Sequence, residues 1–149
     1  MAFSDMVQIK TIIESSTDKS TKRKDLCLFL QGGVSHYNWV GFYLADNEKR
    51  ELKLGEYVGA PTDHSTIPFG RGVCGMVAEG KSMKVVQDVS QLQNYLSCSI
   101  NVKSEIVLPV FKAGVFVAEL DIDSHSPSPF TKADESFLSE VCKMISVLF

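Results

Sequence analysis

Three carboxylates alternate with apolar residues in the segment 115–123, and they are the strongest chemical signal in the sequence. Glu119, Asp121 and Asp123 are spaced two residues apart, so in a β-strand they share one face. Like charges this close repel one another, and no lysine or arginine lies near them in the sequence. The row is either a solvated face of a sheet or part of a functional site. In the second case it is a site for a metal or a ligand ammonium, or a set of acids with one raised pKa.

A second pattern on the same strand could hold a metal ion. Asp121, Asp123 and His125 form Asp-x-Asp-x-His, and carboxylate oxygens are ligands that hard cations prefer. Three ligands are too few for a dedicated site of this kind. We therefore expect no metal here.

The four cysteines differ in their surroundings. Cys98 lies in a polar segment with no strand or helix pattern, and an accessible thiol in a loop is a candidate for reaction. Cys74 lies near the expected start of a helix, where the dipole favours a thiolate. Cys27 and Cys142 stand among apolar residues and are expected to be small buried side chains. No Cys-x-x-Cys pair is present, which argues against a zinc ribbon or a thioredoxin-type centre.

An alternating segment at 36–44 offers a possible binding surface. One face carries Val40, Phe42 and Leu44, and the other carries Tyr37, Trp39, Gly41 and Tyr43. The first face is typical of a core. The second is an aromatic wall with a gap at the glycine, where another group could approach closely. It is either a second packing layer or part of a ligand site.

Residues 70–75 fit the pattern Gly-x-Gly-x-x-Gly. Pro68 stands where the preceding strand of a dinucleotide-binding unit would run, and no alternation of strands and helices surrounds the motif. We therefore interpret it as a turn that needs positive φ angles, leading into a short helix.

The elements that must position these residues follow from periodicity and turn signals. Helices are expected at 5–14, 21–30 and 73–79, and strands at 36–44, 51–58, 83–86, 105–111 and 115–122. The segment 88–102 is polar and irregular. Thr131 and Asp134 form a capping box for a last helix, whose apolar stripe is Phe137, Val141, Ile145 and Leu148. This layout predicts one α+β domain over residues 1–149.

Composition sets the class of protein. The chain has 149 residues, of which 44% are hydrophobic and 22% charged, the mix of an ordinary globular domain rather than a disordered one. There is no apolar run long enough for a membrane span and no signal peptide, so we expect a cytoplasmic protein with reduced thiols and no membrane partner. The net charge of −3 argues against nucleic acid as a partner.

Several of these segments, taken together, resemble the free methionine-(R)-sulfoxide reductases, which are single GAF domains. The matching segments, in the family's order and spacing, are Trp39–Leu44, Ile67–Gly75, Cys98, Ser104–Pro109 and Leu120–Ser124. The resemblance implies a GAF-like fold with a central, mostly antiparallel sheet. It places the N- and C-terminal helices on one face and a ligand pocket on the other.

The resemblance also implies a role for each matched residue. Cys98 stands at the family's nucleophile and Cys74 at a resolving cysteine. Glu105, Asp121 and Asp123 match carboxylates that surround the ammonium and sulfoxide groups of the substrate. Trp39 and Tyr43 match the aromatic pocket for its methyl and sulfur end.

The implied reaction is the thiol-dependent reduction of free methionine sulfoxide, with a thioredoxin-like reductant and no cofactor, in a monomer or a homodimer. Many members of the family carry a third cysteine where this chain has His64, so Cys74 is the matched partner that remains for Cys98. The alternative is a non-catalytic GAF module that senses a small molecule or redox state.

Overall fold

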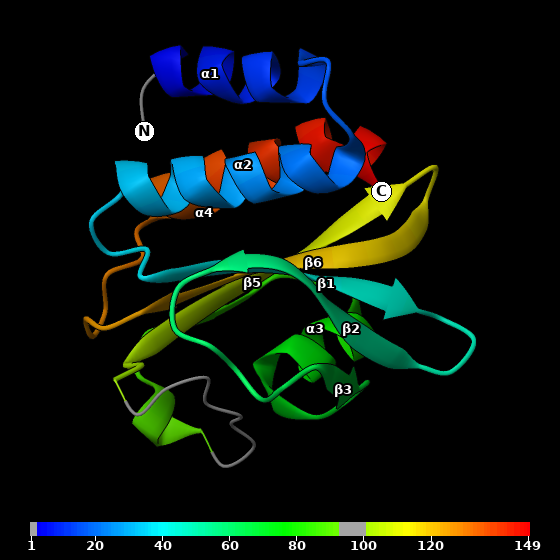
Figure 1. The fold of residues 1–149 in the computed structure, drawn as a ribbon. Coiled ribbons are helices and arrows are strands. Elements are labelled where there is room, and N and C mark those ends of the chain that lie inside the picture. Colours follow the sequence, from blue (N-terminus) through cyan, green and yellow to red (C-terminus); the bar gives the residue numbers. More distant parts are fainter. Residues whose placement is uncertain (1–2, 93–100) are drawn as a thin grey trace.

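An antiparallel sheet forms the centre of the protein (Figure 1). The computed structural model describes residues 3–92 and 101–149. Within these ranges six strands pair in the order β3-β2-β1-β6-β5-β4, and every neighbouring pair is antiparallel. The strands are β1 (Trp39–Asp46), β2 (Glu51–Val58), β3 (Thr66–Pro68), β4 (Lys84–Val86), β5 (Ser104–Lys112) and β6 (Val115–Ser124).

Helices cover both faces of this sheet (Figure 1). They are α1 (Phe3–Glu14), α2 (Lys19–Gly33), α3 (Gly72–Gly80) and α4 (Lys132–Met144), with 3-10 turns η1 (Val89–Gln91) and η2 (Ile145–Leu148). α2 and α4 pack on one face, with α1 outside them, and α3 lies on the opposite face. The expected arrangement of terminal helices on one face is therefore confirmed.

Alternation along the three central strands separates the two faces. The side chains of β1, β6 and β5 that face α2 and α4 are aliphatic or aromatic and fully buried, as in Phe42, Leu120 and Ile106. The stripe of α4 and η2 packs on them, because Phe137, Val141, Ile145 and Leu148 belong to the same apolar cluster. Burial of this cluster is the main stabilising contribution of that face.

Local signals explain how the last two long helices begin. The side chain of Asp18 accepts a hydrogen bond from the Thr21 amide at 2.7 Å and caps α2. Thr131 and Asp134 form the expected capping box at the start of α4. Each cap satisfies backbone amides that have no partner inside the helix.

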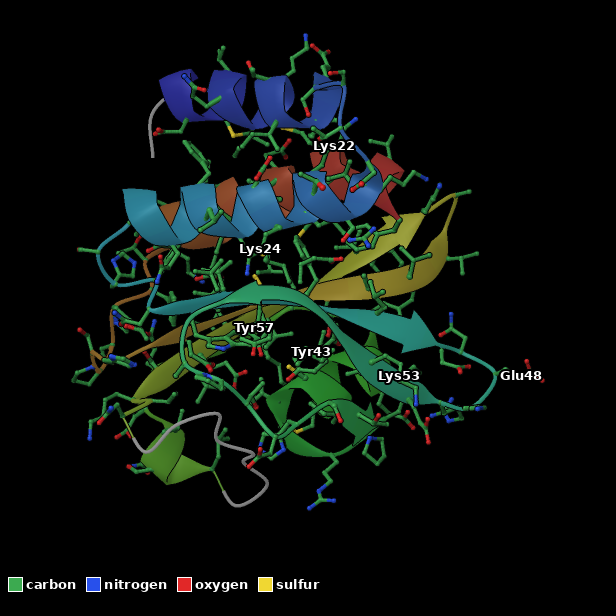
Figure 2. The ribbon with its side chains drawn as sticks, viewed as in Figure 1. Lys22, Lys24, Tyr43, Glu48, Lys53 and Tyr57 are labelled. Carbon is green, nitrogen blue, oxygen red and sulfur yellow. The ribbon has the colours of Figure 1, made fainter. Side chains whose placement is uncertain are left out.

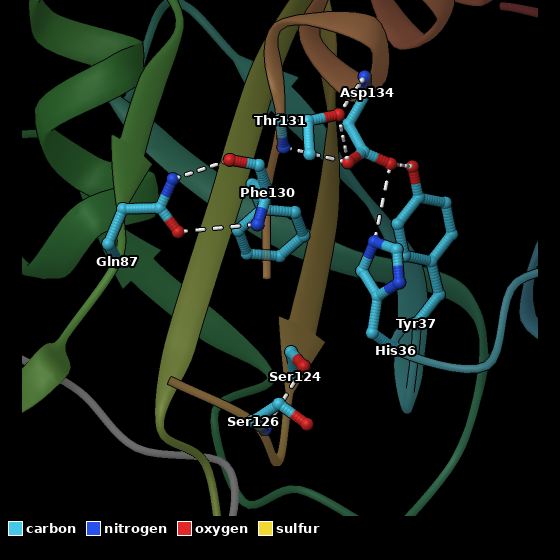
Figure 3. A network of polar contacts seen from close by, with 8 residues as sticks. All are labelled: His36, Tyr37, Gln87, Ser124, Ser126, Phe130, Thr131 and Asp134. Carbon is cyan, nitrogen blue, oxygen red and sulfur yellow. Dashed lines mark hydrogen bonds and ion pairs between the residues drawn. The ribbon is translucent and has the colours of Figure 1, made fainter. Parts of the chain in front are cut away.

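The structure corrects two features of the expected layout. Tyr37 does not join the aromatic wall, because β1 begins two residues later, at Trp39. Its ring packs instead in the cluster below α2 and α4, and its hydroxyl donates to Asp134 at 2.5 Å (Figure 3). The segment ending at Pro68 is a strand, where none was expected from the sequence. The strand β3 is only three residues long and lies at the edge of the sheet, where a proline is tolerated.

Within the part of the chain that the structure describes, we find no helix with the length and apolar character needed to span a bilayer.

Candidate active site

The register of the sheet brings the aromatic wall and the carboxylate row together on the α3 side. Trp39 is opposite Asp123, Gly41 is opposite Asp121, and Tyr43 is opposite Glu119. On the other side of β6, Glu105 is opposite Asp123. Residues directly opposite one another in an antiparallel pair point to the same face. The aromatic wall and the carboxylate row, which were predicted separately, are therefore parts of one surface. Tyr43 belongs to this surface and packs in one cluster with residues of α3 (Figure 2).

The carboxylates on this surface are buried. Glu119 is 0% exposed, Asp121 and Asp123 are each 1% exposed, and Glu105 is 4% exposed. The interpretation of the row as a solvated face is therefore wrong. The physical reason is α3, which packs against β5 and β6 and removes this face from water.

Cys74 completes the cluster from the side of α3. Its thiol lies 3.9 Å from Oε2 of Glu105 and can donate a weak hydrogen bond to it. One atom each from Cys74, Glu105 and Asp121 lies within 4.8 Å of the others. Three of the residues predicted for the site are thus brought into direct proximity.

Burial decides the ionisation of this cluster. Burial raises the pKa of Glu119 well above its usual range, and the negative charge of Asp121 raises it further. The pKa of Asp121 is raised by burial and partly restored by hydrogen bonds from Glu105 and Cys74. Among the described residues, neither oxygen of Glu119 and only one oxygen of Asp121 has a hydrogen-bond partner. An acid in such surroundings holds a proton that it would lose in water.

The expected thiolate at Cys74 is not supported. The residue is only 5% exposed. Burial raises the pKa of its thiol well above the usual range, and the carboxylates around it, Asp121 first, raise it further. The positive end of α3 is weaker than these effects combined, because a helix end carries only about half a unit charge.

Two aromatic side chains form the wall next to these acids. The ring of Trp39 stacks on Tyr57 of β2 at a centroid distance of 5.2 Å and lies 6.5 Å from the ring of Tyr43. The gap expected at Gly41 is filled by this indole, because a Cβ on that glycine would lie 2.5 Å from the Trp39 ring. The glycine therefore admits a neighbouring side chain of the same protein rather than a ligand.

The glycine-rich turn forms the rim of a cavity below the wall. Gly70 and Gly72 have φ angles of 90° and 67°, so the expected need for positive φ is confirmed. The turn leads into α3, and Arg71, Cys74, Glu105 and Asp121 line a cavity of about 10 Å³ together with Tyr43 and His64. That volume holds one water molecule rather than an amino acid. Binding of a larger ligand therefore requires that lining side chains move apart.

The remaining predictions separate into three groups. Cys98 lies outside the described residues, so the structure does not place it. Trp39 and Asp123 share the face of the site without lining the small cavity. Cys27 and Cys142 are buried in the opposite apolar cluster, between the sheet and the helices α2 and α4. Burial raises the pKa of each thiol to about 12.

The comparisons with known proteins identify the class of fold. Residues 26–149 match the family model of the GAF domain, and the chain belongs to the GAF domain family. The GAF-like fold expected from the sequence is therefore confirmed.

Its relatives include reductases of free methionine sulfoxide, as the motifs predicted. The chain is 36% identical to the free methionine-R-sulfoxide reductase of Escherichia coli over 108 aligned residues. This alignment covers 72% of this chain and 64% of the relative. It is 33% identical to Protein YtsP of Bacillus subtilis, over 93% of this chain and 84% of the relative. A structure of the Neisseria meningitidis free methionine-R-sulfoxide reductase in complex with its substrate superposes with a TM-score of 0.89 at 32% identity. The superposition covers 100% of this chain and 92% of the Neisseria meningitidis chain.

Proposed function

We propose that this protein reduces free L-methionine-(R)-sulfoxide to methionine. The observation that carries the proposal is the buried row of carboxylates beside an aromatic wall. Among the described residues, neither Glu119 nor Asp121 forms an ion pair with a lysine or arginine. A buried acidic site of this kind is suited to a ligand that brings its own positive charge, and the free amino acid carries an ammonium group.

The substrate fits the chemistry of the two halves of the site. Its ammonium and its sulfoxide oxygen would face the carboxylates Glu105, Asp121 and Asp123. Its methyl group and sulfur would face Trp39 and Tyr43. Peptide-bound methionine sulfoxide has an uncharged amide in place of the ammonium, so it would bury the row without neutralising it. The same row therefore supports selectivity for the free amino acid.

In the proposed reaction Cys98 attacks the sulfoxide sulfur and takes up its oxygen. The products are methionine and a sulfenic acid on Cys98. Oxygen leaves sulfur more readily when it is protonated, and a carboxylic acid held protonated by burial is a suitable donor. Candidates for the donor are Asp121, Asp123 and Glu105.

The recycling steps use a second thiol. Cys74 condenses with the sulfenic acid, which forms the disulfide and releases water. A thioredoxin-like dithiol then reduces the disulfide by exchange. The raised pKa of Cys74 makes its thiolate scarce at neutral pH, so we expect the condensation to be slower than the first step.

A single-turnover experiment with cysteine variants tests the relay. Cys98→Ser should release no methionine, because a hydroxyl is a poor nucleophile towards the sulfoxide sulfur. Cys74→Ser should release one methionine per protein and stop as the sulfenic acid. Cys27→Ser and Cys142→Ala are the controls and should leave both steps intact, since both residues are buried in the opposite cluster.

Peptide mapping of the wild type after one turnover completes the test. The expected crosslink joins Cys74 to Cys98. A crosslink from Cys98 to Cys27, to Cys142 or to a second chain would contradict the role given to Cys74. Turnover by Cys98→Ser would contradict the role given to Cys98, whereas no turnover by the wild type would favour the small-molecule or redox sensor.

A further inference from the structure

The cavity beside Cys74 has the size of a single ion. Its volume is about 10 Å³, and Cys74, Glu105 and Asp121 are among the residues that line it. Each of the three offers a ligand atom, and these atoms lie within 4.8 Å of one another. A thiolate sulfur together with carboxylate oxygens is a ligand set that Zn²⁺ accepts.

One pair of the ligand atoms lies close to the spacing of tetrahedral coordination. Zinc–sulfur and zinc–oxygen bonds of about 2.3 and 2.0 Å place sulfur and oxygen about 3.5 Å apart around one tetrahedral ion. The Sγ atom of Cys74 is 3.9 Å from Oε2 of Glu105. A shift of a few tenths of an ångström brings this pair to the coordinated distance.

A fourth carboxylate lies beside these three ligands. Glu119 is 0% exposed, and neither of its oxygens has a hydrogen-bond partner among the described residues. It lies on the same face of β6 as Asp121, two residues earlier in the chain, and burial followed by the charge of Asp121 raises its pKa. A carboxylate buried without a partner is costly unless a proton or a cation accompanies it.

The charges around the cavity allow a divalent cation. Arg71 at the exposed rim is the cationic side chain among the described residues that line it. It is opposed by the carboxylates of Glu105 and Asp121 inside the cavity and by Glu119 beside it. Binding would also convert Cys74 to its thiolate and release a proton.

We propose that Cys74, Glu105 and Asp121 form a binding site for a divalent metal ion of the Zn²⁺ type, with Glu119 beside it as a further oxygen donor. From the sequence no metal was expected, because Asp121 was considered only together with Asp123 and His125, which are too few ligands. His125 is exposed and is not one of the three clustered ligands. Occupation of the site would block the substrate ammonium and inhibit the reductase, a consequence that rests on the proposed function.

Cobalt titration of the reduced full-length protein tests the site without any measurement of turnover. A thiolate bound to Co²⁺ gives a charge-transfer band in the near ultraviolet, and we expect this band to saturate at one ion per chain and to disappear on addition of Zn²⁺. Cys74→Ser should abolish the band. Asp121→Asn and Glu119→Gln should each weaken binding by at least about tenfold.

The other three cysteines supply matched controls. Cys98→Ser, Cys27→Ser and Cys142→Ala should keep the band. Its absence in the wild type, or its survival in Cys74→Ser, would overturn the proposal. Failure of cobalt to bind an active reductase would reject only the metal site, and cobalt binding by a protein without reductase activity would reject only the proposed function.

Discussion

Carboxylates occur in two contrasting settings in this protein. Asp134, at the start of α4, accepts hydrogen bonds from the Tyr37 hydroxyl at 2.5 Å and the Thr131 amide at 2.8 Å through its two oxygens, with His36 nearby (Figure 3). Burial alone would raise the pKa of Asp134, but these partners hold it below its usual value. On the α3 side of the sheet, burial raises the pKa of Asp121.

The contrast separates acids that stabilise the fold from acids that remain available. A paired carboxylate lowers the free energy of the folded chain through charge-assisted hydrogen bonds. A buried carboxylate with open coordination raises it, unless a ligand or a proton arrives. We therefore expect substitutions in the two regions to affect different properties.

The largest expected effect is the loss of activity in Asp121→Asn. An amide cannot donate the proton, and it cannot ionise to balance the ammonium charge when the substrate binds. The value of kcat/KM for free methionine-(R)-sulfoxide should therefore fall by at least about 100-fold. Thermal melting should stay level or rise, because repulsion within the row is relieved. The control is Asp134→Asn, which should keep its activity per folded molecule. If Asp121→Asn is inactive only because it unfolds, the row is structural and the contrast fails.

The opposite result is expected for Asp134→Ala. This change removes the reciprocal half of the capping box and leaves the buried Tyr37 hydroxyl without its acceptor. We expect a loss of about 2 kcal/mol in the free energy of unfolding, measured by urea denaturation. Glu140→Ala is the matched control on the same helix, because its exposed contact with Lys143 contributes little. Equal effects of the two substitutions would remove the distinction between them.

A smaller effect on the free energy of unfolding is expected for Glu119→Gln, without the loss expected for Asp134→Ala. The amide has nearly the shape of the protonated acid and carries no charge, so the free energy of unfolding should stay within about 1 kcal/mol of the wild type or increase. Glu56→Gln provides the comparison, because that residue accepts from the Arg23 Nε at 2.7 Å in a partly buried pair. Greater destabilisation by Glu119→Gln than by Glu56→Gln would show that Glu119 has a stabilising partner.

The smallest effect concerns acid stability. Burial raises the pKa of Glu56, but hydrogen bonds from Arg23 and Ser20 outweigh it and hold the pKa below the usual value. A pKa lowered in the folded state contributes stability above the unfolded value, near 4, that is lost as the pH falls through the folded value. Urea denaturation between about pH 5 and pH 3 should show a shallower loss of stability in Glu56→Gln than in the wild type. The same dependence of stability on pH in both proteins would contradict a stabilising pair between Arg23 and Glu56.

Local patterns predicted much of the fold. The bounds of β2, the capping box of α4 and the aliphatic faces of β1 and β6 follow from alternation and cap chemistry within a few residues. β3 could not be predicted in this way, because its three residues pair with β2 over a long turn and include a proline. Tyr37 was assigned to the wrong face because alternation was extended to residues before the strand begins.

The shared face of the carboxylates was predicted from the sequence, but their burial was not. Alternation placed Glu119, Asp121 and Asp123 on one face, yet burial depends on α3, which comes from a segment more than 30 residues earlier in the chain. For the same reason the helix dipole suggested a thiolate at Cys74. The carboxylates that raise the pKa of this thiol lie on β5 and β6, far from Cys74 in the sequence. Glu119 belonged to the row, but only its burial, with no hydrogen-bond partner among residues 3–92 and 101–149, distinguishes it from a surface residue.

The most direct test of the central claim is a chirally resolved assay of substrate loss. Purified protein is incubated with dithiothreitol and a mixture of free methionine-(R)-sulfoxide, the S epimer and the N-acetylated R form, and each is quantified over time. A site built to neutralise buried carboxylates with an ammonium should leave the N-acetylated form almost unchanged. The proposed reaction should consume the free R epimer and leave the S epimer, which differs at the sulfur, almost unchanged as well. Equal consumption of both epimers, preference for the N-acetylated form, or no consumption at all would contradict the account.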